Sequence, residues 1–114
     1  MAIQTFEDVI AWQKARGLAV EIYTLFKSSR DYSFKDQIQR AVISITNNIA
    51  EGFERKSNKE LSYFLYIAKG SCGEVRSMLY IAYDLGYISK TQLQTLNEST
   101  KEISKIIAGL IKSL

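Results

Sequence analysis

Apolar residues recur at alternating intervals of three and four positions along four stretches of the chain. This spacing gathers them on one face of an α-helix, and a repeat of about 3.5 residues is typical of helices that pack side by side at a shallow angle. The pattern predicts helices over about 6–27, 34–51, 58–85 and 90–113. The expected core positions are Trp12, Ala15, Ala19, Ile22, Phe26, Phe34, Ile38, Ala41, Ile45, Asn48, Leu61, Leu65, Ala68, Cys72, Val75, Leu79, Ala82, Leu93, Leu96, Thr100, Ile103, Ile107, Leu110 and Leu114.

Residues with helix-capping chemistry support the same boundaries. A Ser or Thr precedes each predicted helix, where its side-chain oxygen can accept a hydrogen bond from an otherwise unpaired backbone N–H. These expected N-caps are Thr5, Ser33, Ser57 and Ser89. The last two begin the patterns S-x-x-E and S-x-x-Q, which predict capping boxes with Glu60 and Gln92. Gly52 and Gly86 are expected to end the second and third helices in the left-handed conformation that favours glycine.

Short connections determine how the four helices associate. Links of about three to six residues place consecutive helices next to each other in opposite directions. No stretch alternates between apolar and polar residues for long enough to predict a β-strand. The sequence therefore predicts an all-α protein, an antiparallel up-down-up-down four-helix bundle that forms a single domain over 1–114.

The predicted third helix carries more apolar surface than its sister helices can cover. Between Leu61 and Leu85, 16 of 25 residues are apolar, and a helix that is apolar nearly all round is buried on nearly all sides. Gly70 and Gly73 each cost about 1 kcal/mol in a helix interior, which is tolerated where another backbone comes close. We therefore expect self-association; the alternative is that all apolar residues pack inside one monomer. The expected oligomer interface consists of Phe64, Ile67, Ser71, Met78 and Ile81.

The composition excludes several kinds of site. The 114 residues include no His and a single Cys, Cys72. A Ser-His or Cys-His nucleophile, a His metal ligand, an internal disulfide and a multi-Cys zinc site are therefore ruled out. No pair of ionisable groups is predicted to converge in a cleft, so we expect a non-enzymatic protein without metal, cofactor or small-molecule substrate.

The sequence contains no predicted membrane or secretion signal. Residues 1–10 lack a basic n-region, and Glu7 and Asp8 interrupt their apolar residues. Lys69, Glu74 and Arg76 lie near the centre of the longest apolar stretch, where a bilayer would make them costly. We therefore expect a cytoplasmic protein that does not contact a membrane.

The segment SITNNIAEGFERKS, from Ser44 to Ser57, has the richest chemistry. On a structural interpretation, Asn48 sets the helix register, Gly52 ends the helix and Glu51 pairs with Arg55 four positions later. On a functional interpretation, a basic patch contacts phosphate groups and Asn47 contacts bases or sugars. The patch would consist of Arg40, Arg55, Lys56 and Lys59. The net charge of +3 permits contact with nucleic acid without requiring it.

Other candidate groups have simpler interpretations. Glu51 and Glu54 are expected to be solvated at a helix end rather than to act as paired carboxylates. Cys72 falls on the core seam and is expected to be a small buried hydrophobic residue. Trp12 and the tyrosines are expected in the core or an interface rather than as platforms for bases. Lys101, Lys105 and Lys112 share a helix face with Glu98 and Glu102, which indicates an ordinary solvated surface.

Four segments together resemble a known family. They are FEDVIAWQKA, QIQRAVISITNNIAEGFERKS, FLYIAKGSCGEV and LGYIS, from residues 6 to 89. They resemble the bacterial four-helix-bundle proteins encoded in intervening sequences of 23S ribosomal RNA genes. The resemblance implies a ring-like homopentamer, similar also to the accessory protein of diversity-generating retroelements, which binds nucleic acid through a basic surface.

Two functional hypotheses follow from these features. The first is a homo-oligomeric bundle that binds RNA or DNA non-specifically through the basic patch. The second is a protein-interaction or scaffold module with no nucleic-acid role, whose partner docks on the apolar third helix. In both hypotheses the first partner is a second copy of the chain.

Overall fold

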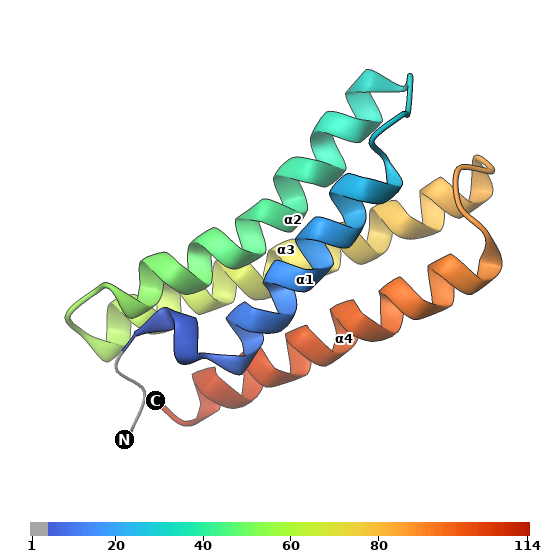
Figure 1. Cartoon of the computed structure of the whole chain (residues 1–114). Coiled ribbons are helices and arrows are strands. Elements are labelled where there is room, and N and C mark those ends of the chain that lie inside the picture. The colour runs from blue at the N-terminus through green and yellow to red at the C-terminus, as the bar shows by residue number, and fades with distance from the viewer. Residues whose placement is uncertain (1–4) are drawn as a thin grey trace.

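The computed structural model describes residues 5–114, which form one short 3-10 turn and four α-helices (Figure 1). The turn η1 covers Phe6–Asp8, and the helices are α1 (Ile10–Leu25), α2 (Tyr32–Phe53), α3 (Asn58–Asp84) and α4 (Lys90–Lys112). No strand occurs in this part of the chain. The all-α prediction is confirmed.

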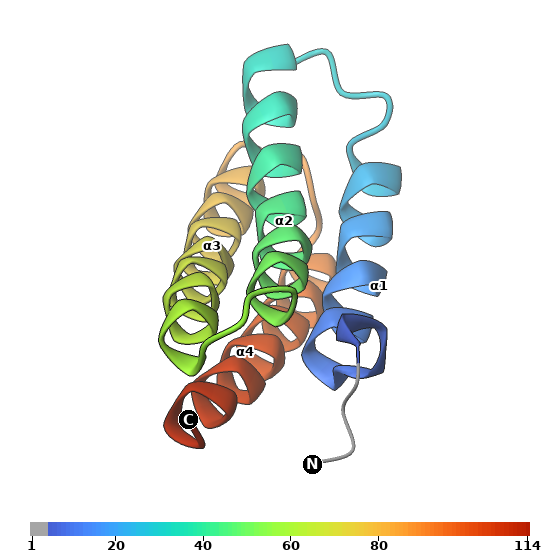
Figure 2. The same ribbon diagram turned by 90° about the vertical axis from the view of Figure 1, so that its left-hand side faces the viewer.

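The four helices are arranged as a ring in which each has two neighbours. α1 packs against α2 and α4, and α3 packs against α2 and α4 (Figure 2). Consecutive helices run in opposite directions, and the bundle measures 44 × 22 × 19 Å. This arrangement is the predicted antiparallel four-helix bundle, and hollows lie between α1 and α2, between α1 and α4, and between α3 and α4.

The core is built from the predicted apolar seams. Ile22, Ile45, Leu65, Leu79 and Ile103 are each 0% exposed, and every helix supplies large side chains to the same cluster. Burying such a side chain stabilises the fold by roughly 1.5–3 kcal/mol. Some positions near the ends of the predicted apolar seams are less buried than expected. Trp12, Leu61 and Leu110 are half-buried, and Leu114 is exposed.

The first helix begins later than predicted. Val9 adopts an extended conformation between η1 and α1 and is 1% exposed, because its side chain belongs to the core cluster. Thr5 does not cap a helix through its side chain, and its hydroxyl lies 3.4 Å from Asp8 Oδ2. The ring of Phe6 packs edge-on against Trp12 at 5.0 Å. The break therefore buries Val9 and folds η1 back over α1.

The limits of α2 correct two predictions. Its N-cap is Asp31 rather than Ser33, because Asp31 Oδ1 accepts a hydrogen bond of 3.2 Å from the backbone N–H of Phe34. Gly52 does not end the helix, which continues to Phe53. A Cβ at Gly52 would lie 3.0 Å from Leu61 Cδ1, so the glycine allows α3 to approach α2 closely.

The starts of the last two helices follow the sequence closely. Ser57 Oγ accepts a hydrogen bond from Glu60 N at 3.1 Å and donates to Glu60 Oε1 at 3.2 Å, so it caps α3 without a reciprocal bond to its own N–H. Ser89 and Gln92 form the complete capping box that was predicted. Gly86 has a φ of 78° after α3, as expected for a helix-terminating glycine.

Candidate nucleic-acid interface and self-association surface

Arg55 is committed to contacts within its own chain. Its guanidinium lies 3.0 Å from Glu51 Oε2 and 3.6 Å from Glu60 Oε2, and it stacks 4.9 Å from the centre of the Phe64 ring. These contacts join the end of α2 to the start of α3. The pairing with Glu51 is the predicted one, and it leaves Arg55 as a poor candidate for binding phosphate.

Lys56 and Lys59 remain available to a ligand. Both are exposed in or beside the turn between α2 and α3, and neither takes part in an ion pair within residues 5–114. The C-terminal end of α4 lies beside this turn (Figure 1). Lys112 therefore contributes a further positive charge at the same end of the bundle.

The structure does not bring Arg40 and Asn47 together with these lysines. Arg40 lies toward the N-terminal end of α2, about 20 Å along the helix from its last residue, and it pairs with Asp36 at 2.9 Å. Asn47 is exposed in the groove between α1 and α2, where it lines a hollow with Trp12 and Arg16. The predicted patch is thus divided among three places on the surface.

Asn48 belongs to a polar cluster between α2 and α3. Its Nδ2 donates to the backbone oxygen of Ser44 at 2.8 Å and to Ser44 Oγ at 3.0 Å. Ser71 Oγ on α3 donates to the same Ser44 Oγ at 2.8 Å. The bond that crosses between the helices therefore comes from the two serines, and the Asn48 amide orients Ser44.

The expected oligomer interface on α3 is only partly exposed. Ser71 is 8% exposed and Met78 is 6% exposed, because both face α2 and the core. Phe64 is half-buried beneath Arg55. Ser71 and Met78 therefore do not form part of an exposed stripe, since the third helix turns more of its circumference toward its neighbours than the spacing indicated.

Ile67 and Ile81 do lie on the outer surface. They are 37% and 47% exposed, and Tyr63, one turn before Ile67, is 63% exposed. Between them, a Cβ added at Gly70 or Gly73 would meet no atom within 4 Å. The close backbone approach expected at these two glycines is therefore not made by any other helix in the part of the chain that the structure describes.

The groove between α3 and α4 gathers half of the lysines and arginines that form no ion pair within residues 5–114. Its residues recur every three or four positions on the facing flanks of the two helices, and four of the cations line its hollows. The cations are Lys69, Arg76, Lys90, Lys101, Lys105 and Lys112. None of them forms an ion pair within residues 5–114. We call this surface the α3–α4 groove.

The acidic residues balance this groove incompletely. Glu98 lines its wall and Asp84 lies one helical turn after Tyr80, whereas Glu102 points to α1 and pairs with Lys14 at 3.1 Å. Six cations thus face two carboxylates in the groove, while the whole chain has 15 against 12. The sequence predicts Glu102 on the same solvated face as the lysines of α4. In the structure Glu102 turns instead to Lys14 on α1, a partner that the spacing along α4 alone does not reveal.

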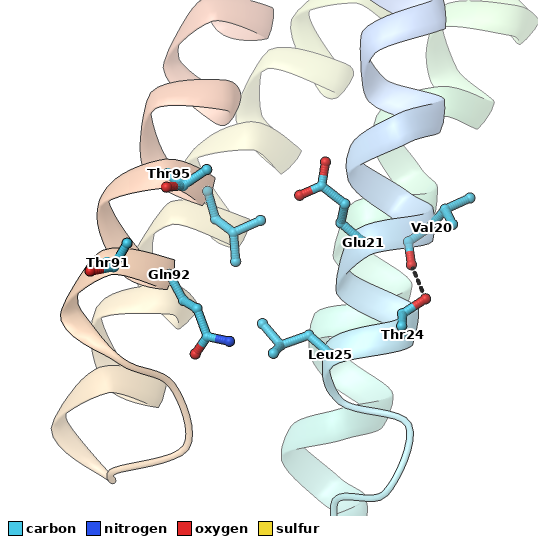
Figure 3. A pocket seen from close by; sticks show the side chains of 8 residues that line it. Val20, Glu21, Thr24, Leu25, Thr91, Gln92 and Thr95 are labelled. Carbon is cyan, nitrogen blue, oxygen red and sulfur yellow. Dashed lines mark hydrogen bonds between the residues drawn. The ribbon is translucent and has the colours of Figure 1, made fainter.

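Another cavity lies between α1 and α4. It has a volume of about 420 Å³, and Figure 3 shows Leu25 and Glu21 from α1 facing Gln92 and Thr95 from α4. The Thr24 hydroxyl turns back to the backbone oxygen of Val20 at 2.8 Å. The only charged group in its wall is Glu21, so this cavity lacks the convergent polar groups of a catalytic site.

The remaining reactive group is held away from solvent. Cys72 is 0% exposed, and this burial raises the pKa of its thiol to about 11 despite the nearby charges of Arg76 and Lys69. It is the small buried residue that was expected. Residues 5–114 contain no cluster of three acidic or cysteine side chains that could hold a metal ion. Nor is any helix in that range long and apolar enough to cross a membrane.

These features define an all-helical four-helix-bundle protein whose accessible chemistry is carried by lysines, arginines and tyrosines. The chain belongs to the 23S rRNA-intervening sequence protein family, whose model matches residues 7–109. The family resemblance found in the sequence is thereby confirmed. No functionally curated protein shows significant similarity to the chain.

A solved structure has the same fold. It is a protein of unknown function from the S23 ribosomal protein family of Bacteroides thetaiotaomicron, and it is 27% identical to this chain. The match covers 90% of this chain and 96% of that one, with a TM-score of 0.84. The likeness therefore extends over nearly the whole of both bundles.

Proposed function

We propose that this protein binds RNA or DNA without sequence specificity through a basic surface, and that it does so as a homo-oligomer. The excess of unpaired cations in the α3–α4 groove is the observation that carries this proposal. Lysines that neutralise phosphates release condensed counterions, so such a groove attracts any nucleic-acid backbone. Lys56 and Lys59 extend the positive charge beyond the Lys112 end of the groove.

The test is a titration of a fluorescent oligonucleotide at several salt concentrations. The wild-type affinity should fall steeply with salt, and Lys101→Gln/Lys105→Gln should weaken binding on all sequences alike. Each lysine that contacts a phosphate should contribute about 1 to the slope of log K against log salt. The matched control is Lys27→Gln/Arg40→Gln, which removes the same charge away from the groove and should leave the slope unchanged. Undetectable binding at about 50 mM salt would overturn the proposal.

Self-association is proposed through the outer face of α3. Ile67, Ile81 and Tyr63 expose apolar surface there, and in a closed ring the same charged groove would be repeated around the particle. The homopentamer implied by the family resemblance is the proposed assembly. Light scattering should show a multiple of the 13.0 kDa chain mass. Ile67→Asp or Ile81→Asp should reduce it, whereas the exposed α2 change Gln37→Asp should not.

A protein-interaction or scaffold module remains the second candidate. The exposed Ile67 and Ile81 favour it, because the same surface could receive another protein. In that case the lysine variants would have no binding phenotype, while the Ile67→Asp variant would lose its partner. A stable wild-type monomer in solution would remove the support for self-assembly.

A further inference from the structure

A cavity in the α3–α4 groove has the chemistry of a nucleobase site. It lies near the turn between the two helices and has a volume of about 320 Å³, at the lower end of the range of about 300–1,000 Å³ typical of ligand pockets. Tyr80 and Tyr83 form its α3 wall. The α4 wall consists of Lys90, Leu93, Gln94, Asn97, Glu98 and Lys101.

Asn97 is the unusual residue of this cavity. It lies on the buried seam of α4, it is only 6% exposed, and its Oδ1 has no hydrogen-bond partner within residues 5–114. Buried polar atoms are nearly always hydrogen-bonded, and one without a partner reduces stability. The neighbouring Thr100 is satisfied, since its hydroxyl donates to Leu96 O at 2.7 Å. The Oδ1 atom itself is buried, so a ligand group in the cavity would complete its bonding once the Asn97 amide turns toward the cavity that it lines.

The tyrosines and lysines suit the other parts of a nucleotide. Tyr80 and Tyr83 are 50% and 40% exposed, and aromatic side chains that solvent can reach are the groups on which the bases of a single strand stack. Lys90 and Lys101 are exposed at the rim, where they can meet the phosphates on either side of it. The Asn97 amide offers both a donor and an acceptor, and rotation about its last torsion exchanges their positions. It can therefore pair with the edge of any base that enters.

A second hollow continues the groove toward the other end of the helices. Tyr66 and Lys69 on α3 face Lys112 on α4 around a volume of about 250 Å³. The stretch between the two hollows passes Gly73, where an added Cβ would meet no atom within 4 Å. The groove thus presents two tyrosine–lysine sites about 20 Å apart along α3, with the open space at Gly73 between them.

We infer that the α3–α4 groove holds a single strand of nucleic acid, with one unstacked base in the Asn97 cavity. This inference rests on the proposed function and narrows its ligand from any nucleic acid to a single strand. The bases of a duplex are stacked and paired and cannot enter the cavity, whereas those of a single strand can be turned out onto aromatic side chains.

The test compares an unstructured oligonucleotide with a duplex of the same length at one salt concentration. Wild-type protein should bind the single strand more tightly. Asn97→Leu, which keeps the branched shape and the number of heavy atoms but removes the amide, should weaken single-strand binding by about 5-fold or more and leave duplex binding unchanged. Tyr83→Leu, at an exposed position that does not support the core, should have the same effect. Lys101→Gln should weaken the binding of both the single strand and the duplex.

Two further measurements distinguish a loss of binding from a loss of folding and test whether Asn97 itself contacts the strand. Circular dichroism and thermal melting check that each variant folds, and the side-chain NH₂ resonance of Asn97 should shift when the single strand is added. Equal binding of both ligands, unaffected by Asn97→Leu and Tyr83→Leu, overturns the inference but leaves the proposed function intact. Failure to bind either ligand overturns both. A change in oligomeric mass on Asn97→Leu, without nucleic acid, assigns the cavity to a second copy and overturns the inference.

Discussion

The Tyr87 hydroxyl donates a hydrogen bond of 2.6 Å to Asp31 Oδ2, and so joins two loops that are 56 residues apart in the sequence. The other carboxylate oxygen of Asp31 caps α2, and the Tyr87 ring packs edge-on against Phe34 at 5.6 Å. This bond lowers the pKa of Asp31 and raises the pKa of Tyr87. The start of α2 is therefore fixed by the α3–α4 loop.

Replacing Tyr87 by Phe should lower the melting temperature near neutral pH. Because the folded protein depresses the pKa of Asp31, the stability from this bond is present above the usual Asp value of about 4 and is lost as pH falls through the lower folded value. The raised pKa of Tyr87 means that it is also lost at alkaline pH, above about 10. The difference in melting temperature between wild type and Tyr87→Phe should therefore shrink at both extremes.

Tyr32→Phe is the matched control, since Tyr32 is 71% exposed and neighbours the same cap. It should melt like the wild type at every pH. A difference for Tyr87→Phe that stays constant from acid to alkaline pH would show that the ring, and not the bond to Asp31, is responsible.

Local sequence patterns predicted the fold because each helix carries its own information. The apolar seams identified Leu65 and Ile103 in the core, and Ser57 and Ser89 marked helix starts through contacts three residues away. The local pattern predicts Ser33 as the N-cap of α2. The structure uses Asp31 instead, because Tyr87, which lies far away in the sequence, hydrogen-bonds to the Asp31 carboxylate.

The candidate site was harder to predict, because a charge on one helix acts with whichever helix lies beside it. The sequence predicts one basic patch of Arg40, Arg55, Lys56 and Lys59, but Arg55 pairs with Glu51 and Glu60. Glu102 pairs with Lys14 of α1 and so does not neutralise the lysines beside it on α4. Helical spacing predicts on which face of its own helix a residue lies, but not which residue of another helix lies next to it.

Gly52 and Gly70 should respond in opposite ways to replacement by alanine. A Cβ at Gly52 would lie 3.0 Å from Leu61 Cδ1 and 3.1 Å from Phe64 Cβ, and the latter cannot turn aside without moving α3. Overpacking costs about 1–3 kcal/mol, so we expect Gly52→Ala to lower the free energy of unfolding. At Gly70 the space within one chain is open, so at protein concentrations where the chain is monomeric the better helix propensity of Ala should add up to about 1 kcal/mol.

Chemical denaturation of both variants provides the measurement, with the slope against denaturant checked for a change in the folded state. Greater stability of Gly52→Ala would mean that α2 and α3 separate easily at this point. A loss of stability in Gly70→Ala that depends on protein concentration would instead show that a second copy packs against Gly70.

Arg55→Ala should destabilise the fold by about 1 kcal/mol with little effect on nucleic-acid affinity. It removes two partly exposed ion pairs, which contribute about 0–1 kcal/mol, and a stacking contact with Phe64 of about 0.5–1 kcal/mol. Arg40→Ala is the comparison, because its single pair with Asp36 is largely exposed. We expect its stability to change by less than about 0.5 kcal/mol. A large loss of binding in Arg55→Ala would return Arg55 to the phosphate-contacting surface.

Cys72 should report directly on the opening of the bundle. It is the single cysteine of the chain, it is 0% exposed, and its thiol pKa of about 11 keeps it protonated at pH 8. The thiolate is the reactive form, and an exposed cysteine has a pKa near 8.5. Alkylation of the native protein at pH 8 should therefore be at least about 100-fold slower than in denaturant, from the pKa difference alone.

Alkylation rates in variants of different stability show whether the burial of Cys72, or only the raised pKa of its thiol, slows the reaction. If labelling requires the helices to part, the rate should rise in proportion to the open population in any destabilised variant, including Gly52→Ala. The same rate in wild type and Gly52→Ala would mean that the reagent reaches Cys72 without unfolding. Labelling of the native protein within a few-fold of the denatured rate would contradict the burial of Cys72 between α3 and its neighbours.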